Sequence, residues 1–128
     1  MKRLSLIWFV LGLAVSLFGQ TPTCYRVYLS DKNNSPYSID NPEAYLSQRA
    51  LQRRANLNIS IDEYDIPVNP QYLQAVADCG AELLNPSKWL NGVSVHVTNP
   101  SVIEAINALE FVQVVRNCPN NPQAQERK

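Results

Sequence analysis

Three cysteines and one histidine are the side chains of this sequence with the greatest chemical potential. Cys24, Cys79 and Cys118 lie far apart in the chain, and His96 is its only histidine. Zinc sites place four such ligands at short, characteristic spacings, and this sequence has no such pattern. In an oxidising compartment three cysteines allow one disulfide and one spare thiol. We therefore expect a structural disulfide and no metal site.

The sequence also lacks the patterns typical of catalysis and of cofactor binding. A catalytic triad needs a nucleophile and a carboxylate beside its histidine. The glycines, Gly12, Gly19, Gly80 and Gly92, form neither the Gly-x-Ser-x-Gly turn of a hydrolase nor a glycine-rich phosphate loop. His96 lies among alternating valines, where a surface position on a strand is the simpler interpretation. We expect no enzymatic activity and no cofactor.

The amino-terminal residues are typical of a secretory signal peptide. Lys2 and Arg3 precede an apolar run at residues 4–18, and small and polar residues follow at Gly19 and Gln20. This run of about 15 residues is shorter than the roughly 20 residues that a membrane-spanning helix needs. We expect cleavage near residue 19 or 20, and the alternative is a membrane anchor.

Composition divides the chain into three parts. We predict a signal peptide at residues 1–20, one domain at residues 21–118 and a flexible polar tail at residues 119–128. The product would be exported, to the periplasm or beyond the cell. The full sequence balances 11 basic against 11 acidic side chains, and loss of Lys2 and Arg3 leaves an acidic excess. Because nucleic-acid binding needs a basic patch, we expect no nucleic-acid partner, and no membrane contact after cleavage.

Alternating apolar residues predict a sheet. Val93, Val95 and Val97 alternate with Ser94 and His96, which is typical of a strand with one buried face. The expected strands are residues 24–29, 81–84, 89–97 and 111–115, with a turn at residues 85–88. The expected helices, each opened by an Asn-Pro pair, are residues 40–56, 69–79 and 99–109.

This order of elements indicates an α+β fold. With the first helix treated as an insertion after the first strand, the order is βαββαβ, the split or ferredoxin-like pattern. We expect a four-stranded antiparallel sheet with two helices on one face, plus the inserted helix. In such a sheet the first and last strands are neighbours, and Cys24 and Cys118 fall at the same end. We therefore expect a disulfide between them, with Cys79 as the spare thiol.

One arginine of the first helix falls on its apolar side. Arg54 lies within the arc that includes Leu46, Ala50 and Leu51. We favour the interpretation that its alkyl stem covers apolar surface while its guanidinium reaches water. The alternative is a partly buried ion pair with the acidic group at residues 62–65.

Several segments, in order along the chain, resemble one family. The string Tyr-Leu-Ser-Gln-Arg-Ala-Leu-Gln-Arg-Arg-Ala at residues 45–55 looks like the FLSxRALxRRA segment in the amino-terminal prosegments of secreted subtilisin-like serine proteases from Bacteroidetes-type bacteria. Their IDExDxPV, PxYL, SKWLNAVSV and FVxxV segments are similar to residues 61–68, 70–73, 87–95 and 111–115. No segment here matches the protease's catalytic Asp, His or Ser, so no catalytic residue carries over.

The resemblance implies a non-catalytic domain that assists the folding of a subtilisin-like serine protease and inhibits it. Such domains lay the open face of their sheet on two surface helices of the enzyme, and their carboxy-terminal tail lies in the active-site cleft. The residues expected to contact the partner are Tyr28, Ser94, His96, Phe111, Gln113, Asn120 and Asn121.

The sequence leaves two points open. On the last strand, Phe111, Gln113 and Val115 face outward in one alternation, which would give the partly apolar surface that partners prefer. In the other alternation these residues join the core, and Val112 and Val114 face outward. The chain would also fit a remnant of a truncated protease precursor, or a secreted structural or interaction module with the same fold.

Overall fold

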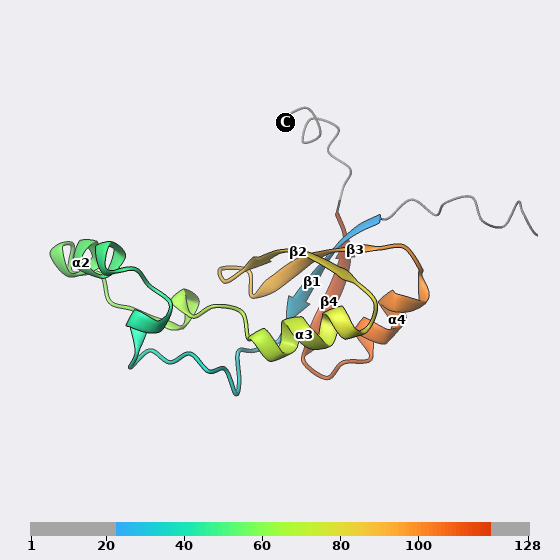
Figure 1. Ribbon diagram of the computed structural model, residues 1–128, viewed down its shortest axis with the longest axis horizontal. Coiled ribbons are helices and arrows are strands. Elements are labelled where there is room, and N and C mark those ends of the chain that lie inside the picture. The colour runs from blue at the N-terminus through green and yellow to red at the C-terminus, as the bar shows by residue number, and fades with distance from the viewer. Residues whose placement is uncertain (1–22, 119–128) are drawn as a thin grey trace, which may run out of the picture.

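The computed structural model describes residues 23–118, which form four strands and three α-helices (Figure 1). The strands are β1 (Thr23–Leu29), β2 (Glu82–Ser87), β3 (Gly92–Val97) and β4 (Val112–Asn117). The α-helices are α2 (Gln48–Asn56), α3 (Pro70–Asp78) and α4 (Ser101–Asn107), and short 3-10 helices lie at Pro42–Ala44 and Glu63–Asp65. None of the helices in this range has the length and apolar content needed to cross a bilayer. The predicted signal peptide and tail lie outside the described residues.

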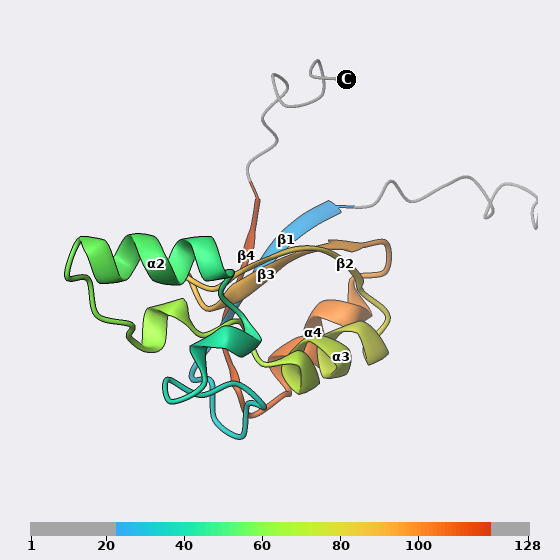
Figure 2. The ribbon, with the colours of Figure 1, turned by 60° about the vertical axis from the view of Figure 1, so that its left-hand side comes forward.

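The strands form one antiparallel sheet in the order β2-β3-β1-β4. The predicted α+β class and the four-stranded antiparallel sheet are therefore confirmed. Helices α3 and α4 lie together on one side of the sheet (Figure 2). Helix α2 projects past one end of the sheet and has no buried residue (Figure 1). The opposite side of the sheet is thus free of α3 and α4, and we call it the open face.

Alternation places one apolar row of each central strand against the two helices. In β3, Val93, Val95 and Val97 are buried, as the pattern predicted. They pack with Val76 of α3 and Ile106 of α4, both of which are fully buried. Their burial stabilises the fold, at roughly 25 cal/mol for each Å² of apolar surface removed from water.

Two backbone positions fix the ends of these elements. Gly80 ends α3 with φ of 101°, the left-handed conformation that glycine adopts without strain. At Gly92 an added Cβ would lie 2.5 Å from the carbonyl oxygen of Val27, so β1 and β3 can approach only because this residue has no side chain.

The predicted first helix is wrong over its amino-terminal half. Residues 42–44 form only a short 3-10 helix, and the side chain of Asn41 makes no capping hydrogen bond there. A separate α-helix begins at Gln48, where the Ser47 side chain accepts the backbone N–H of Ala50 at 3.3 Å. The Ser47 cap therefore sets the start of α2.

The other boundaries shift by a few residues. Strand β2 continues through the segment predicted as a turn, and it includes Pro86. This is possible because β2 is an edge strand with β3 as its one neighbour in the sheet. Proline has no backbone N–H, and on an edge strand no second strand needs one from it. Strand β3 begins at Gly92 rather than residue 89, and β4 ends two residues later than predicted, at Asn117.

The favoured interpretation of Arg54 is also wrong, and the alternative is confirmed. Its guanidinium forms an ion pair with the carboxylate of Asp65, whose side chain is 1% exposed. The Lys88 ammonium lies 4.0 Å from the same carboxylate. A buried carboxylate needs such partners, and this pair ties α2 to the second 3-10 helix.

Candidate functional site

The open face carries polar and charged side chains from both central strands. Strand β1 places Arg26 and Tyr28 there, because Val27 between them is buried on the helix side. Strand β3 places Ser94 and His96 on the same face, each partly exposed between buried valines. The sequence predicted this face for Tyr28, Ser94 and His96, and the structure brings the three together on neighbouring strands.

Strand β4 follows neither of the two predicted alternations throughout. Its register with β1 shifts between Tyr28 and Leu29. Val112 and Val115 therefore both pack against the core, although they are three positions apart and regular alternation would place them on opposite faces. Val114, paired with Tyr28, lies on the open face. A strand irregularity of this kind adds one residue to one strand, and simple alternation cannot reveal it.

Two expected contact residues near the start of β4 lie in different places. The ring of Phe111 stacks on Tyr72 of α3, with ring centroids 4.0 Å apart and planes 2° from parallel. Phe111 therefore lies on the helix side, as in the alternation that placed it in the core, and it does not belong to the open face. Gln113 is exposed at the register shift. Asn120 and Asn121 lie outside the described residues.

A pair of arginines stands out on the open face. Arg26 of β1 lies directly opposite Arg116 of β4, and both are exposed. The Arg116 guanidinium lies 5.8 Å from the ring centroid of Tyr28. Together with Asn117 and Cys118 these side chains line a hollow of about 370 Å³. Arg116 was not among the expected contact residues, because the predicted last strand ended at residue 115.

The arginine pair has no acidic partner among the described residues. Ion pairs there involve Arg54, Lys88 and His96, but neither Arg26 nor Arg116. Like charges directly opposite each other on adjacent strands destabilise a sheet. The open face therefore holds two guanidiniums that an external carboxylate could pair with at once.

One row of the open face resembles the arrangement of a cysteine hydrolase. Cross-strand pairing aligns Glu82, His96 and Cys24, and the His96 Nδ1 lies 3.6 Å from a carboxylate oxygen of Glu82. Burial, followed by contact with the thiol of Cys118, raises the pKa of Cys24 to about 11. A catalytic thiol needs a lowered pKa, so Cys24 is a poor nucleophile at neutral pH.

Within residues 23–118 no group of three or more ligating side chains could hold a metal ion.

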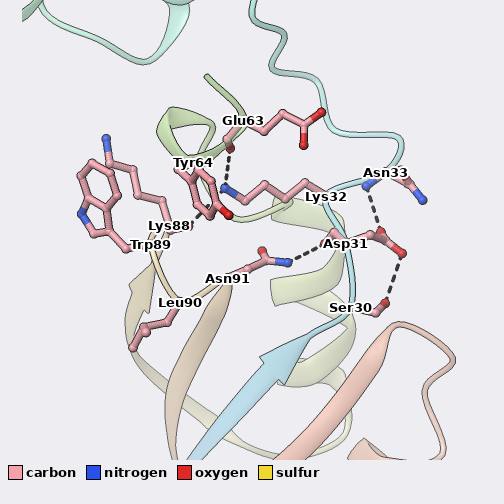
Figure 3. Close-up of a pocket in the computed structure, with 10 residues that line it drawn as sticks. All are labelled: Ser30, Asp31, Lys32, Asn33, Glu63, Tyr64, Lys88, Trp89, Leu90 and Asn91. Atoms are coloured by element: carbon pink, nitrogen blue, oxygen red, sulfur yellow. Dashed lines mark hydrogen bonds between the residues drawn. The ribbon is translucent and has the colours of Figure 1, made fainter. Parts of the chain in front are cut away.

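A larger cavity, of about 540 Å³, lies where β1 ends and β2 turns into β3 (Figure 3). The Lys32 ammonium donates hydrogen bonds to the backbone oxygens of Glu63 at 2.9 Å, Ile66 at 2.6 Å and Lys88 at 3.1 Å. These bonds use all three of its N–H groups, so none is left for a ligand. Lys32 thus ties three segments of the chain together, and the geometry indicates a structural role.

The chain was compared with protein-family models, curated proteins and solved structures. A family model for the Peptidase S8 propeptide domain of Bacteroidota matches residues 24–128. This match covers all the described strands and helices except Thr23, the first residue of β1. No curated protein and no solved structure matches the chain. The family expected from the segment at residues 45–55 is therefore confirmed, and the chain belongs to the Peptidase S8 propeptide family of Bacteroidota.

Proposed function

We propose that this chain is a non-catalytic prosegment-like domain that binds a subtilisin-like serine protease, assists its folding and inhibits it. Family membership supports an association with such a protease. The observation that carries the proposal is the open face, where Arg26 and Arg116 lie side by side without acidic partners among the described residues. An aspartate or glutamate of the protease, placed between them, would relieve this repulsion.

The proposed docking surface consists of the open-face side chains Arg26, Tyr28, Ser94, His96, Val114 and Arg116. Tyr28 and Val114 supply apolar area beside the charges, as interface cores do. Helices α3 and α4 stabilise this face from behind without competing for it (Figure 2). The strand order and the two helices on one side also support a ferredoxin-like split βαβ arrangement, which we propose as the fold.

The remaining parts of the proposal concern residues beyond the described range. Residues 1–20 direct export and are removed, so that the product acts in the periplasm or outside the cell. Residues 119–128 then lie in the active-site cleft of the protease, where Asn120 and Asn121 make contacts. Proline at positions 119 and 122 lowers the entropy lost when this segment is ordered.

An inhibition assay tests the central proposal. The chain is incubated with a subtilisin-like serine protease, and hydrolysis of a small chromogenic peptide is followed. We expect inhibition at nanomolar to micromolar concentration. The variant Arg26→Glu places a carboxylate opposite the proposed carboxylate of the protease. Because like charges repel, we expect the inhibition constant to rise about tenfold or more. Digestion of the chain with no slowing of peptide hydrolysis at any time would refute inhibition.

A matched control separates the docking surface from net charge. The double variant Gln71→Glu and Gln74→Glu makes the same change in charge on exposed positions of α3, behind the sheet. We expect its inhibition constant to stay within twofold of the parent chain. If both variants weaken inhibition equally, the open face is not the docking surface.

Two further measurements address the folding and tail parts of the proposal. A denatured protease should regain activity faster, or in higher yield, when the chain is present during refolding. Truncation after Cys118 should weaken inhibition by at least tenfold, and unchanged inhibition would refute the position of the tail in the cleft. A remnant of a precursor, or a structural module, would leave both protease activity and refolding unaffected.

A further inference from the structure

Two cysteines face each other at the end of the sheet where the described chain begins and ends. In the register of β1 and β4, Tyr25 lies opposite Asn117, so the next pair outward is Cys24 and Cys118. The backbone N–H of Cys118 donates to the carbonyl oxygen of Cys24 at 2.9 Å, which continues the ladder to this pair. The structure records both as free thiols.

The backbone geometry suits a covalent link between them. Directly opposed residues that share such a hydrogen bond have Cα atoms about 5.5 Å apart. Disulfides in proteins span Cα distances of about 4.4–6.8 Å, so this pair can be bridged without moving either strand. Both side chains lie on the open face, since each is three residues from a core valine, Val27 or Val115. The Cys118 thiol is also near enough to Cys24 to raise the pKa of its thiol.

We propose that Cys24 and Cys118 form a disulfide in the exported chain, joining β1 to the edge strand β4, while Cys79 stays a free thiol. Two S–H bonds break and one S–S bond forms. The two electrons and two protons pass to a disulfide-bonded oxidant, either a thiol–disulfide oxidoreductase or a small-molecule disulfide, which leaves as two thiols. This inference goes beyond the proposed function and does not depend on any protease.

The third cysteine is unable to compete for either partner. Cys79 caps the carboxyl end of α3 and packs against the core on the helix side of the sheet. Its thiol donates to the carbonyl oxygen of Ala75 at 3.3 Å. The sheet separates it from Cys24 and Cys118, so the fold selects one pairing out of the three that three cysteines allow.

The acidity of Cys24 determines how the bond should be formed in a test. Burial and the neighbouring Cys118 thiol raise the pKa of Cys24 to about 11, so little of the reactive thiolate exists in the folded, reduced chain at neutral pH. Attack by the Cys24 thiol on an oxidant would therefore be slow in an already folded sample. Refolding in a mixture of reduced and oxidised glutathione avoids this obstacle, because the unfolded chain does not hold the thiol in that environment.

The experiment maps the cysteines after such refolding of the chain. Free thiols are first alkylated, and the protein is then digested and analysed by mass spectrometry without reductant. We expect one linked pair of peptides, containing Cys24 and Cys118, and alkylation at Cys79. Alkylation of all three cysteines, or a bond that includes Cys79, would overturn the proposal.

A stability measurement provides a second, independent readout. The bond would close a loop of about 94 residues, and in the chain-entropy model such a loop raises Tm by about 10 °C or more. The same refolded sample is therefore melted with and without reductant. The Cys79→Ala variant should keep the full shift, while Cys24→Ser should show none. Equal Tm values for the oxidised and reduced parent chain would contradict a stabilising bond, even if Cys24→Ser failed to fold.

Discussion

The two faces of the sheet come from the same strands but differ in their side chains, which are apolar and buried on one face and mostly polar on the other. On the helix side, Val27, Val93 and Val95 are at most 1% exposed and contact α3 and α4. On the open face, residues one position away along the same strands are polar, and Arg26 lies opposite a second arginine. The helix side therefore supplies the stability, and the open face is left free to be selected for recognition.

A stable domain can carry locally unfavourable contacts on a surface such as the open face, which we propose that a partner covers. The core valines contribute roughly 1.5–3 kcal/mol each when fully buried. A cross-strand pair of like charges costs only a fraction of this. The domain can thus keep Arg26 and Arg116 together at small cost to its folding.

Placing a carboxylate at either of two adjacent residues on opposite faces of β3 should produce the largest difference in the free energy of unfolding. Val95→Asp places a carboxylate in the core with no partner, and we expect it to lower the free energy of unfolding by at least about 4 kcal/mol. Ser94→Asp places the same group beside Arg26, and we expect a change within about 1 kcal/mol. Urea denaturation measures both. Similar losses would show that the two faces do not differ as described.

A second pair of variants tests the irregular strand β4. Phe111→Ala removes the ring that stacks on Tyr72, and we expect a loss of about 2–3 kcal/mol in the free energy of unfolding. Gln113→Ala changes an exposed side chain, and we expect a change within about 0.5 kcal/mol. Urea denaturation again provides the measurement. A larger loss at Gln113 than at Phe111 would mean that their faces are reversed.

A third variant addresses the close approach of β1 and β3. Gly92→Ala would place a methyl group 2.5 Å from the Val27 carbonyl oxygen, so the strands must separate, and we expect a loss of about 2 kcal/mol. Gly80→Ala meets nothing closer than 3.4 Å and suffers only from its positive φ, so we expect about 1 kcal/mol. Thermal melts compare the two. An unchanged Tm for Gly92→Ala would show that the strands are farther apart.

The sequence predicted the helix side of the sheet well because local patterns determine it. The alternating valines of β3 have one simple interpretation, a strand with one buried face, and this prediction is confirmed. The family was also evident from short segments such as residues 45–55. These features depend on residues that are close together in the sequence, so they can be predicted without knowing the tertiary structure.

The features that the sequence did not predict depend on contacts between distant segments. The register shift beside Leu29 decides which side chains of β4 face outward, and it arises only when β1 and β4 pair. The choice between the two interpretations of Arg54 likewise depends on how the chain after α2 turns back and brings Asp65 to it. A pattern can give the parity within each strand, but the alignment of two strands requires the tertiary structure.

A substitution at Arg26 should change the free energy of unfolding least, and it separates stability from binding on the open face. Arg26→Glu replaces a repulsive cross-strand pair by an attractive one with Arg116, so we expect the isolated domain to gain about 0.5 kcal/mol in free energy of unfolding. The gain should shrink at high salt, because exposed charges are screened. The same variant is expected to inhibit the protease less well. Stability and binding would then change in opposite directions at a single residue. If Arg26→Glu instead lost 1 kcal/mol or more, Arg26 would be a packing residue, and the open face would not be reserved for a partner.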